Sequence, residues 1–129
     1  MTADAQDTAA RRQLSALAED PTAGWAPARR LEQDAALLGR LLMAAADHQQ
    51  SAGQHPDVAA DDVGAGLRLF EGMRVTLDRL ETQVVIEARR RGMEWREIAG
   101  HQGLNSSQAA SQRYQRLMTR LEEIRQGVR

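Results

Sequence analysis

Hydrophobic residues recur at helical spacing in two long segments of the chain. In the first, residues 28–50, they fall three or four positions apart: Leu31, Ala35, Leu38, Leu42 and Ala45. The second, from about residue 57 to 91, continues the pattern with Val63, Leu67, Phe70, Met73, Leu77, Leu80, Val84 and Ala88. This spacing places the side chains on one face of a helix. A loop with Gly53 and Pro56 separates the segments, which predicts two amphipathic helices joined as an antiparallel hairpin.

These two stripes allow two interpretations that can hold together. They can bury one another within one chain, or they can form the interface of a homodimer, since a two-helix hairpin covers little surface by itself. Gly64 and Gly66 weaken the start of the second helix, so we expect it to bend or to begin late. The candidate seam comprises Leu31, Leu38, Leu42, Phe70, Met73 and Leu77.

Two shorter helices follow the long ones. Gly92 follows three arginines and ends the second helix, and the next helix spans from Glu94 or Trp95 to about Gln102. Gly103 and Leu104 then form a tight turn. The last helix opens with Asn105 or Ser106 as its N-cap. Its predicted buried face comprises Ala110, Tyr114 or Arg113, Leu117, Leu121 and Ile124. A short helix, a glycine turn and a longer helix predict a helix-turn-helix.

The expected fold class is all-α. An N-terminal antiparallel helical hairpin, with a long central helix, leads into a C-terminal helix-turn-helix. Residues 1–24 form a flexible tail, disordered up to Ala10, with a short helix between Arg11 and Glu19 and a turn from Asp20 to Gly24. Residues 25–76 form the hairpin and candidate dimerisation region, and residues 77–129 form the helix-turn-helix region. Aromatic residues are only 3% of the chain, so the core must be built from aliphatic side chains.

Charge is distributed unevenly although the formal net charge is only −1. Residues 1–67 contain five arginines and ten acidic residues, whereas residues 68–129 contain twelve arginines and eight acidic residues. The basic half is the one that carries the predicted helix-turn-helix, and a basic surface suits contact with phosphate. All 17 basic residues are arginine, which together with abundant alanine and glycine suggests an actinobacterial source.

Several kinds of chemistry find no support in the sequence. There is no cysteine, and His48, His55 and His101 are too dispersed to suggest a metal site. No glycine-rich phosphate loop, secretory signal or apolar run of membrane-spanning length occurs. We therefore expect a cytoplasmic, nucleoid-located protein that is not an enzyme, has no cofactor and does not bind a membrane.

The last helix has a polar face without acidic residues from Ser106 to Arg120. Glutamine can pair with adenine and serine with either base type, as contact with the major groove requires. An ordinary solvated helix face is the alternative. Arg113 could instead brace the motif through Glu94 or Glu97. The predicted base contacts are Ser107, Gln108, Ser111 and Gln112. The predicted phosphate contacts are Arg91, Arg96, Ser106, Arg113 and Arg116.

The segments from Ala88 to Ala99 and from Gly103 to Leu117 resemble the helix-turn-helix of small actinobacterial regulators, which is akin to the C-terminal DNA-binding region of sigma factors. The resemblance implies a DNA-binding fold and no particular target. This sequence departs from the family pattern at Ser107, where a basic residue is expected. The departure puts a strong phosphate or guanine contact at that position in doubt.

Three functions follow as hypotheses. The first is a transcriptional regulator that binds double-stranded DNA, with a homodimer as a candidate assembly. The second is an interaction module that docks on RNA polymerase, a sigma factor or an antisigma factor, which the acidic N-terminal half favours. The third is a nucleoid-associated architectural protein that binds DNA with little sequence preference.

Overall fold

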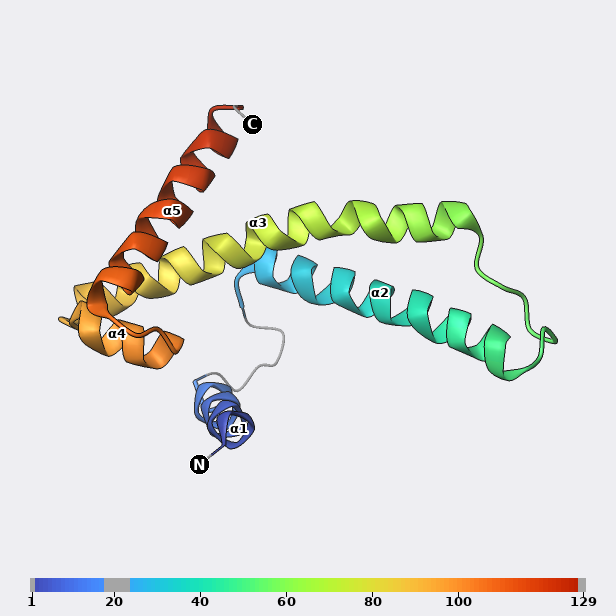
Figure 1. Ribbon diagram of the computed structural model, residues 1–129, viewed down its shortest axis with the longest axis horizontal. Coiled ribbons are helices and arrows are strands. Elements are labelled where there is room, and N and C mark those ends of the chain that lie inside the picture. The colour runs from blue at the N-terminus through green and yellow to red at the C-terminus, as the bar shows by residue number, and fades with distance from the viewer. Residues whose placement is uncertain (1, 18–23, 128–129) are drawn as a thin grey trace.

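A computed structural model describes residues 2–17 and 24–127, and these residues are all-helical with no strand (Figure 1). The all-α prediction is therefore confirmed for the described chain. The helices are α1 (Ala3–Ser15), α2 (Ala26–Gln50), α3 (Ala60–Arg90), α4 (Trp95–Gln102) and α5 (Ser107–Arg125). Helix α3 packs against both α2 and α5, and α4 packs against α5.

The N-terminal helix α1 begins earlier than the sequence pattern predicted. It starts at Ala3, so the expectation of disorder up to Ala10 and of a helix opening at Arg11 was wrong. The Thr2 hydroxyl oxygen accepts a hydrogen bond from the Ala5 amide at 3.1 Å, and Asp4 lies in the first turn, where a negative charge suits the helix dipole. Every residue of α1 is exposed. The end of the predicted helix at Glu19, and most of the predicted turn from Asp20, lie outside the described residues.

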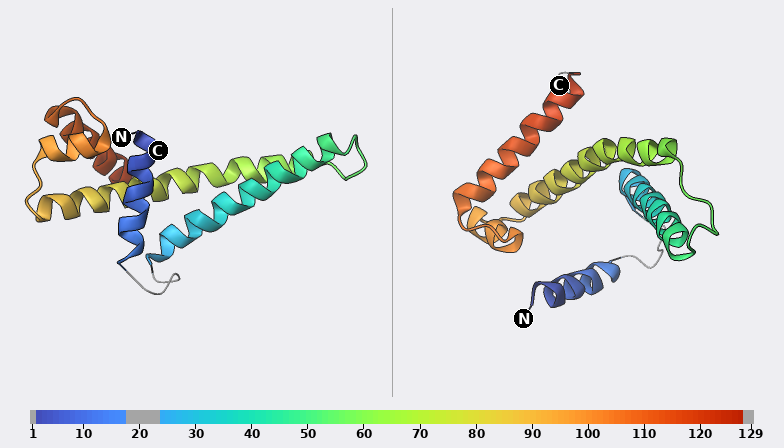
Figure 2. Two further views of the ribbon diagram at one scale, coloured as in Figure 1. Left: turned by 90° about the horizontal axis from the view of Figure 1, so that it is seen from below. Right: turned by 45° about the vertical axis from the view of Figure 1, so that its right-hand side comes forward.

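Helices α2 and α3 lie side by side and run in opposite directions (Figures 1 and 2). Gly66 is buried where they approach closely: a Cβ atom there would lie 2.8 Å from Leu41 Cδ2 and 3.3 Å from Leu38 Cδ2. Helix α3 begins at Ala60, before Gly64 and Gly66, so the two glycines do not delay it. Gly66 thus allows the close packing of the two helices that a larger residue would obstruct.

Helices α3 and α4 end with the same glycine-dependent motif. Gly92 and Gly103 have φ values of 82° and 73°, as the sequence pattern anticipated for both. The Met93 amide donates to the Ala88 carbonyl at 3.0 Å, and the Leu104 amide donates to the Ala99 carbonyl at 2.8 Å. These six-to-one hydrogen bonds define Schellman motifs. Each motif turns its next residue, Met93 or Leu104, onto the same apolar core.

The core of the C-terminal unit is small and is shared by three helices. Val85 of α3, Ile98 and Ala99 of α4, and Ala110 of α5 form one buried cluster. At its edge the Trp95 and Tyr114 rings lie 5.7 Å apart at their centroids and are tilted by 44°. Leu117, two helical turns beyond Ala110, is also buried. The predicted buried face of the last helix matches: Leu121, Ile124 and Tyr114 are half-buried on the same side.

Among residues 2–17 and 24–127, no helix is both long enough and apolar enough to cross a membrane.

The first prediction concerns the turn between α4 and α5. We expect Gly103→Ala to lower the free energy of unfolding by about 1–2 kcal/mol, because φ at that position is 73° and an L-residue is strained there. No atom obstructs the added methyl group within 4 Å, so the loss is conformational. Urea unfolding followed by circular dichroism measures it.

Gly100→Ala is the matched control. Gly100 is inside α4, is equally unobstructed and has an ordinary helical conformation. Alanine there should raise the free energy of unfolding by up to about 1 kcal/mol. Equal destabilisation by both substitutions would contradict the conformational explanation.

Candidate nucleic-acid interface

Helix α5 presents a polar face opposite the core. Ala110 and Leu117 are buried, and successive residues turn by about 100° around a helix. Gln108 and Gln112 therefore project away from the core, and both are exposed. No acidic residue lies in the first turn of α5. The face thus offers amide donors and acceptors to a partner without opposing negative charge.

The structure separates the four predicted base contacts. Ser107, Gln108 and Gln112 are exposed, whereas Ser111 is half-buried toward the side of the helix. Ser111 is therefore the least accessible of the four. The four base-contact assignments stay predictions.

Two residues on the same face were not among the predicted contacts. Gln115 and Thr119 are exposed and continue the series begun by Gln108 and Gln112, at spacings of four, three and four. A shallow hollow along α5 is lined by Gln112, Gln115, Arg116, Thr119, Arg120 and Glu123. The helical spacing in the sequence could have identified Gln115 and Thr119 as part of this face. The accessible polar face is therefore longer than the predicted contact set.

Ser106 caps the N-terminus of α5. Its hydroxyl oxygen accepts a hydrogen bond from the Ala109 amide at 3.1 Å, which decides between the two predicted caps in favour of Ser106 over Asn105. As a predicted phosphate contact, Ser106 still has its hydroxyl proton to donate. The amides of the first turn also point outward at the positive end of the helix dipole.

The N-terminus of α4 has the opposite character. Glu94 is its N-cap and Glu97 lies in its first turn. The Glu97 carboxylate accepts a hydrogen bond from the Glu94 amide at 3.4 Å. Acidic residues therefore occupy this end of α4, and an anion is disfavoured there. Of the two helices, α5 is the one whose start suits a nucleic-acid phosphate.

Arg113 pairs with a residue that the sequence pattern did not indicate. Its guanidinium makes a two-point interaction with Glu81 of α3, with Nη2 donating to Oε1 at 2.8 Å and Nε donating to Oε2. Bracing by Glu94 or Glu97, the alternative considered from the sequence, is thus replaced by bracing through Glu81. The Gln102 amide also donates to Glu81, at 3.3 Å. This carboxylate joins α3, α4 and α5, and Arg113 is partly withdrawn from any phosphate.

The hydrogen bond from Arg113 lowers the pKa of Glu81 below its ordinary value, against the opposing effect of burial. The same bond raises the pKa of Arg113. Both shifts favour the charged pair. A second ion pair joins the same helices further along, with Arg120 Nη1 at 2.8 Å from Asp78 Oδ2. Two arginines of α5 are thus engaged by α3.

The remaining predicted phosphate contacts fall into two groups. Arg91 pairs with Glu87, four residues earlier, at 3.0 Å, although its side chain is largely exposed. Arg96 and Arg116 are exposed and form no ion pair within the described residues. Arg89, which was not a predicted contact, lies over the Trp95 ring at 5.0 Å. Among the described residues on and beside α5, few cations are therefore free to meet a phosphate.

Comparison with known proteins adds no further constraint on the site. No protein-family model, curated protein or solved structure matches this chain. Across residues 2–17 and 24–127, no group of three or more histidine or acidic side chains is placed to hold a metal ion. The binding capacity of α5 lies in its amides, its hydroxyls and the guanidinium of Arg116.

The second prediction is a pH dependence of stability that Glu81 controls. Because its folded pKa lies below the ordinary value of 4.5, Glu81 stabilises the fold above that pH, and the contribution is lost as pH falls through the folded pKa. We expect Glu81→Gln to lower the free energy of unfolding by about 1 kcal/mol or less near pH 7, since the pair is partly solvated. The deficit should shrink as pH falls from about 5 to about 3.

Glu71→Gln provides the control, because Glu71 is exposed on the same helix and forms no ion pair within the described chain. Thermal unfolding at several pH values compares the two variants with the parent protein. If the deficit of Glu81→Gln is as large at pH 3 as at pH 7, the charged pair is not its cause.

Proposed function

We propose that α4, the Gly103 turn and α5 form a helix-turn-helix that binds duplex DNA, and that the protein is a DNA-binding transcriptional regulator. The observation that carries the proposal is the exposed, acid-free amide and hydroxyl face of α5, on a helix held firmly against α3. Helix α5 is the recognition helix in this proposal. The resemblance of residues 88–117 to small actinobacterial regulators supports the same function.

The chemistry of this face suits the major groove. An α-helix fits that groove, and glutamine there can pair with the N6 and N7 edge of adenine. Residues near the start of a recognition helix contact bases, which favours Ser107, Gln108 and Gln112. Gln115 and Thr119 extend the same face and serve as additional candidate contacts. Ser106, Arg96 and Arg116 are the candidate phosphate contacts with exposed side chains.

The charge arrangement sets the expected strength of binding. Since most arginines near α5 are paired within the chain, each copy has about two to four phosphate contacts to offer. The logarithm of the binding constant should then fall with the logarithm of salt concentration with a slope of about −2 to −4 per chain. Sequence preference must come mainly from the amide face.

The third prediction tests that assignment. In gel shifts with a random-sequence duplex pool and with genomic DNA, at two salt concentrations, the parent protein should retain DNA at low salt. Sites selected from the pool should bind more tightly than the unselected pool. Replacing both Gln108 and Gln112 with alanine should reduce that preference about tenfold or more, at about 1–3 kcal/mol per lost base contact. Binding to unselected DNA should change much less.

Two further variants distinguish base contact from general effects. Gln83→Ala removes an exposed glutamine on α3 and should leave both affinities unchanged. Arg116→Gln should weaken binding to every sequence and reduce the salt slope by about 1. Equal losses on all sequences in the Gln108/Gln112 variant would refute base readout. Binding of the parent protein without any preference would favour the architectural function.

A docking module for RNA polymerase or a sigma or antisigma factor is the second candidate. The pairing of Arg113 and Arg120 with α3 favours it, because it leaves a weakly basic surface beside α5. Absence of any shift at low salt, together with direct binding to purified RNA polymerase or a sigma factor, would support this candidate in place of DNA binding.

A further inference from the structure

The two arginines of α5 that pair with α3 are held in different ways. Arg113 donates to Glu81 from two guanidinium nitrogens, and Glu81 accepts a third hydrogen bond from Gln102. Arg120 donates to Asp78 from Nη1 alone, at 2.8 Å, and its side chain makes no other hydrogen bond within residues 2–17 and 24–127. Since a guanidinium has five N–H donors, most of those of Arg120 stay available. Arg113 thus belongs to the joint between three helices, whereas Arg120 is tethered at one point.

The surroundings of the two arginines also differ. The Arg120 side chain is 59% exposed, and that of Arg113 is 45% exposed. Arg113 lines an apolar hollow between α3, α4 and α5, where Ile98 of the core is also reached. Arg120 instead lines the shallow hollow along α5, together with Gln112 and Gln115. Of the two arginines, Arg120 therefore borders the face that we propose meets DNA.

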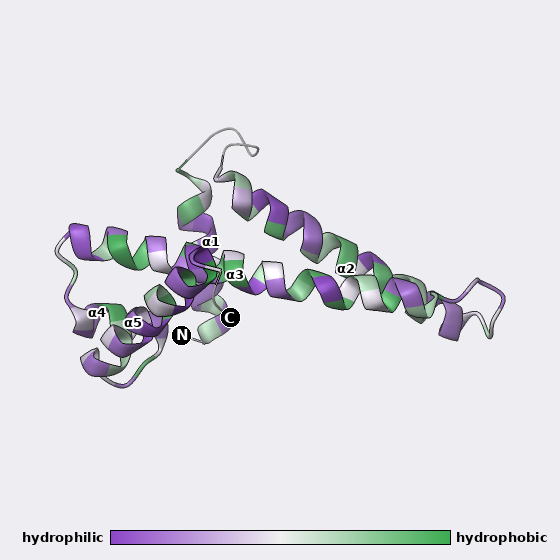
Figure 3. Ribbon diagram, turned by 90° about the horizontal axis from the view of Figure 1, so that it is seen from above, coloured by the Kyte–Doolittle hydropathy of each residue, from purple (hydrophilic) through white to green (hydrophobic). Residues whose placement is uncertain are grey.

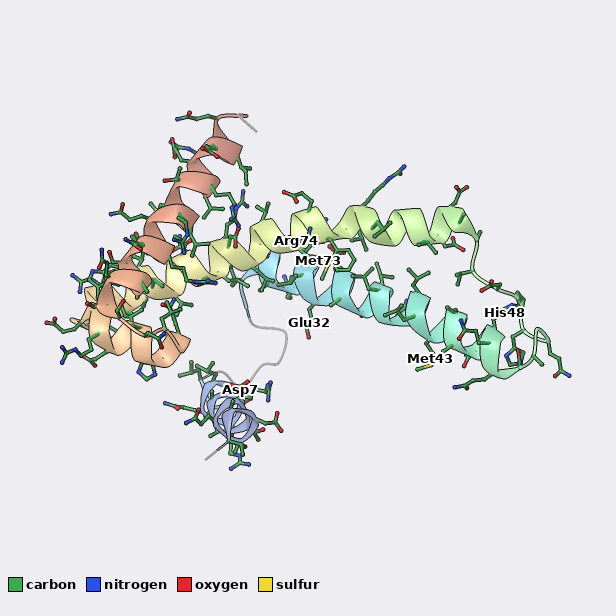
Figure 4. The ribbon with its side chains drawn as sticks, viewed as in Figure 1. Asp7, Glu32, Met43, His48, Met73 and Arg74 are labelled. Atoms are coloured by element: carbon green, nitrogen blue, oxygen red, sulfur yellow. The ribbon has the colours of Figure 1, made fainter. Side chains whose placement is uncertain are left out.

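The polar character of α5 extends as far as Arg120. Helix α5 is mostly hydrophilic in Figure 3, and nitrogen-bearing side chains follow its length in Figure 4. Arg120 lies about 12 Å beyond Gln112 along the helix axis, at a rise of 1.5 Å per residue. The major groove is also about 12 Å wide, so Arg120 is near the bordering phosphates when Gln112 meets a base edge. Glu123, three residues further, is the acidic side chain at the far end of this hollow.

Release of Arg120 from Asp78 requires little free energy. Because the Arg120 side chain is mostly in water, the pair resembles surface ion pairs, which change an equilibrium constant by about fivefold or less. Glu81 is the main cause of the raised pKa of Arg113, and the charge of Asp78 adds to it. Asp78 therefore keeps a cationic neighbour when Arg120 turns away. Duplex DNA offers the competing partner, with one phosphate charge per about 1.7 Å of its axis.

We propose that Arg120 exchanges Asp78 for a DNA phosphate when α5 enters the groove, whereas Arg113 stays on Glu81 and contacts no phosphate. The inference rests on the proposed DNA binding and reassigns two arginines within it. Arg120, which the sequence pattern did not select, takes the place of Arg113, which it did. Asp78 then lowers the affinity for DNA, because each binding event must break its ion pair. The pair holds α5 on α3 before binding and limits how tightly a duplex is bound.

The fourth prediction is a coupling between Asp78 and Arg120 in DNA affinity. Fluorescence anisotropy of a labelled random-sequence duplex, titrated with the full chain at several salt concentrations, measures it. Arg120→Gln should make the salt slope shallower by about 1. Asp78→Asn should tighten binding by about two- to fivefold, because Arg120 no longer has an ion pair to lose. In a chain that already carries Arg120→Gln, Asp78→Asn should lose this effect, because no arginine remains to be released.

Two control variants separate exchange from simpler effects. Arg113→Gln should leave the salt slope unchanged, and a shallower slope would contradict the assignment of Arg113. Glu71→Gln removes an exposed acidic charge of α3 and should leave the affinity unchanged. Equal tightening by Asp78→Asn with and without Arg120 would indicate a general charge effect and refute the exchange. An unchanged slope in Arg120→Gln would refute it as well.

The design also covers a folding defect and a failure of the proposed function. If Arg120→Gln loses helical circular dichroism, the slope is compared between Asp78→Asn and the double variant, in which no carboxylate is left without its cation. The same decrease of about 1 is expected. A parent protein that does not bind the duplex at low salt refutes DNA binding itself, and the exchange with it. A parent protein that binds, with additive effects of the two substitutions, refutes only the exchange.

Discussion

Close contact between small side chains fixes the C-terminal half of the molecule. Ala99 and Ala110 are almost fully buried against each other's helices and against Val85, so α4 and α5 approach closely at this point. A larger side chain at either alanine would force the helices apart or strain neighbouring rotamers. Because the buried side of α5 is set here, the opposite side, with Gln108 and Gln112, is set as well. The orientation of the candidate interface is therefore a consequence of packing in the core.

The ion pairs of Arg113 and Arg120 add to this packing but alter what the surface can bind. Each holds α5 to α3 through a carboxylate that is less exposed than the arginine it contacts. Each also neutralises a cation that the amino-acid composition alone would assign to a phosphate. The excess of arginine in residues 68–129 consequently overstates the positive charge that a nucleic acid would meet. Stability of the unit and affinity for phosphate draw on the same side chains.

Local features of the fold could be predicted from sequence, whereas partnerships between distant residues could not. Hydrophobic spacing and capping residues predict the boundaries of α2 to α5 to within a few residues. They also predict the left-handed conformation of Gly92 and Gly103 and the buried side of α5. The partners of Arg113 and Arg120 lie 32 and 42 residues away, and periodicity does not identify them. The same holds for the candidate seam. Spacing predicts that Leu38 and Leu42 lie on the apolar face of α2, but only the position of α2 on α3 shows that Leu38 contacts α3 and that Leu42 is exposed. Helix α1 was missed for another reason, since its polar composition concealed a well-capped start.

The scarcity of free cations beside α5 bears on whether one chain can bind DNA alone. With about two to four phosphate contacts, one chain would bind DNA weakly at physiological salt, since each contact contributes through release of a counterion. A homodimer would carry two α5 helices and double the number of contacts that act together. Linked sites gain affinity in this way only if the geometry lets both engage at once. A homodimer would therefore allow a weakly basic helix to bind DNA usefully. A monomer with the same surface would be better suited to docking on a protein, where fewer charges are required.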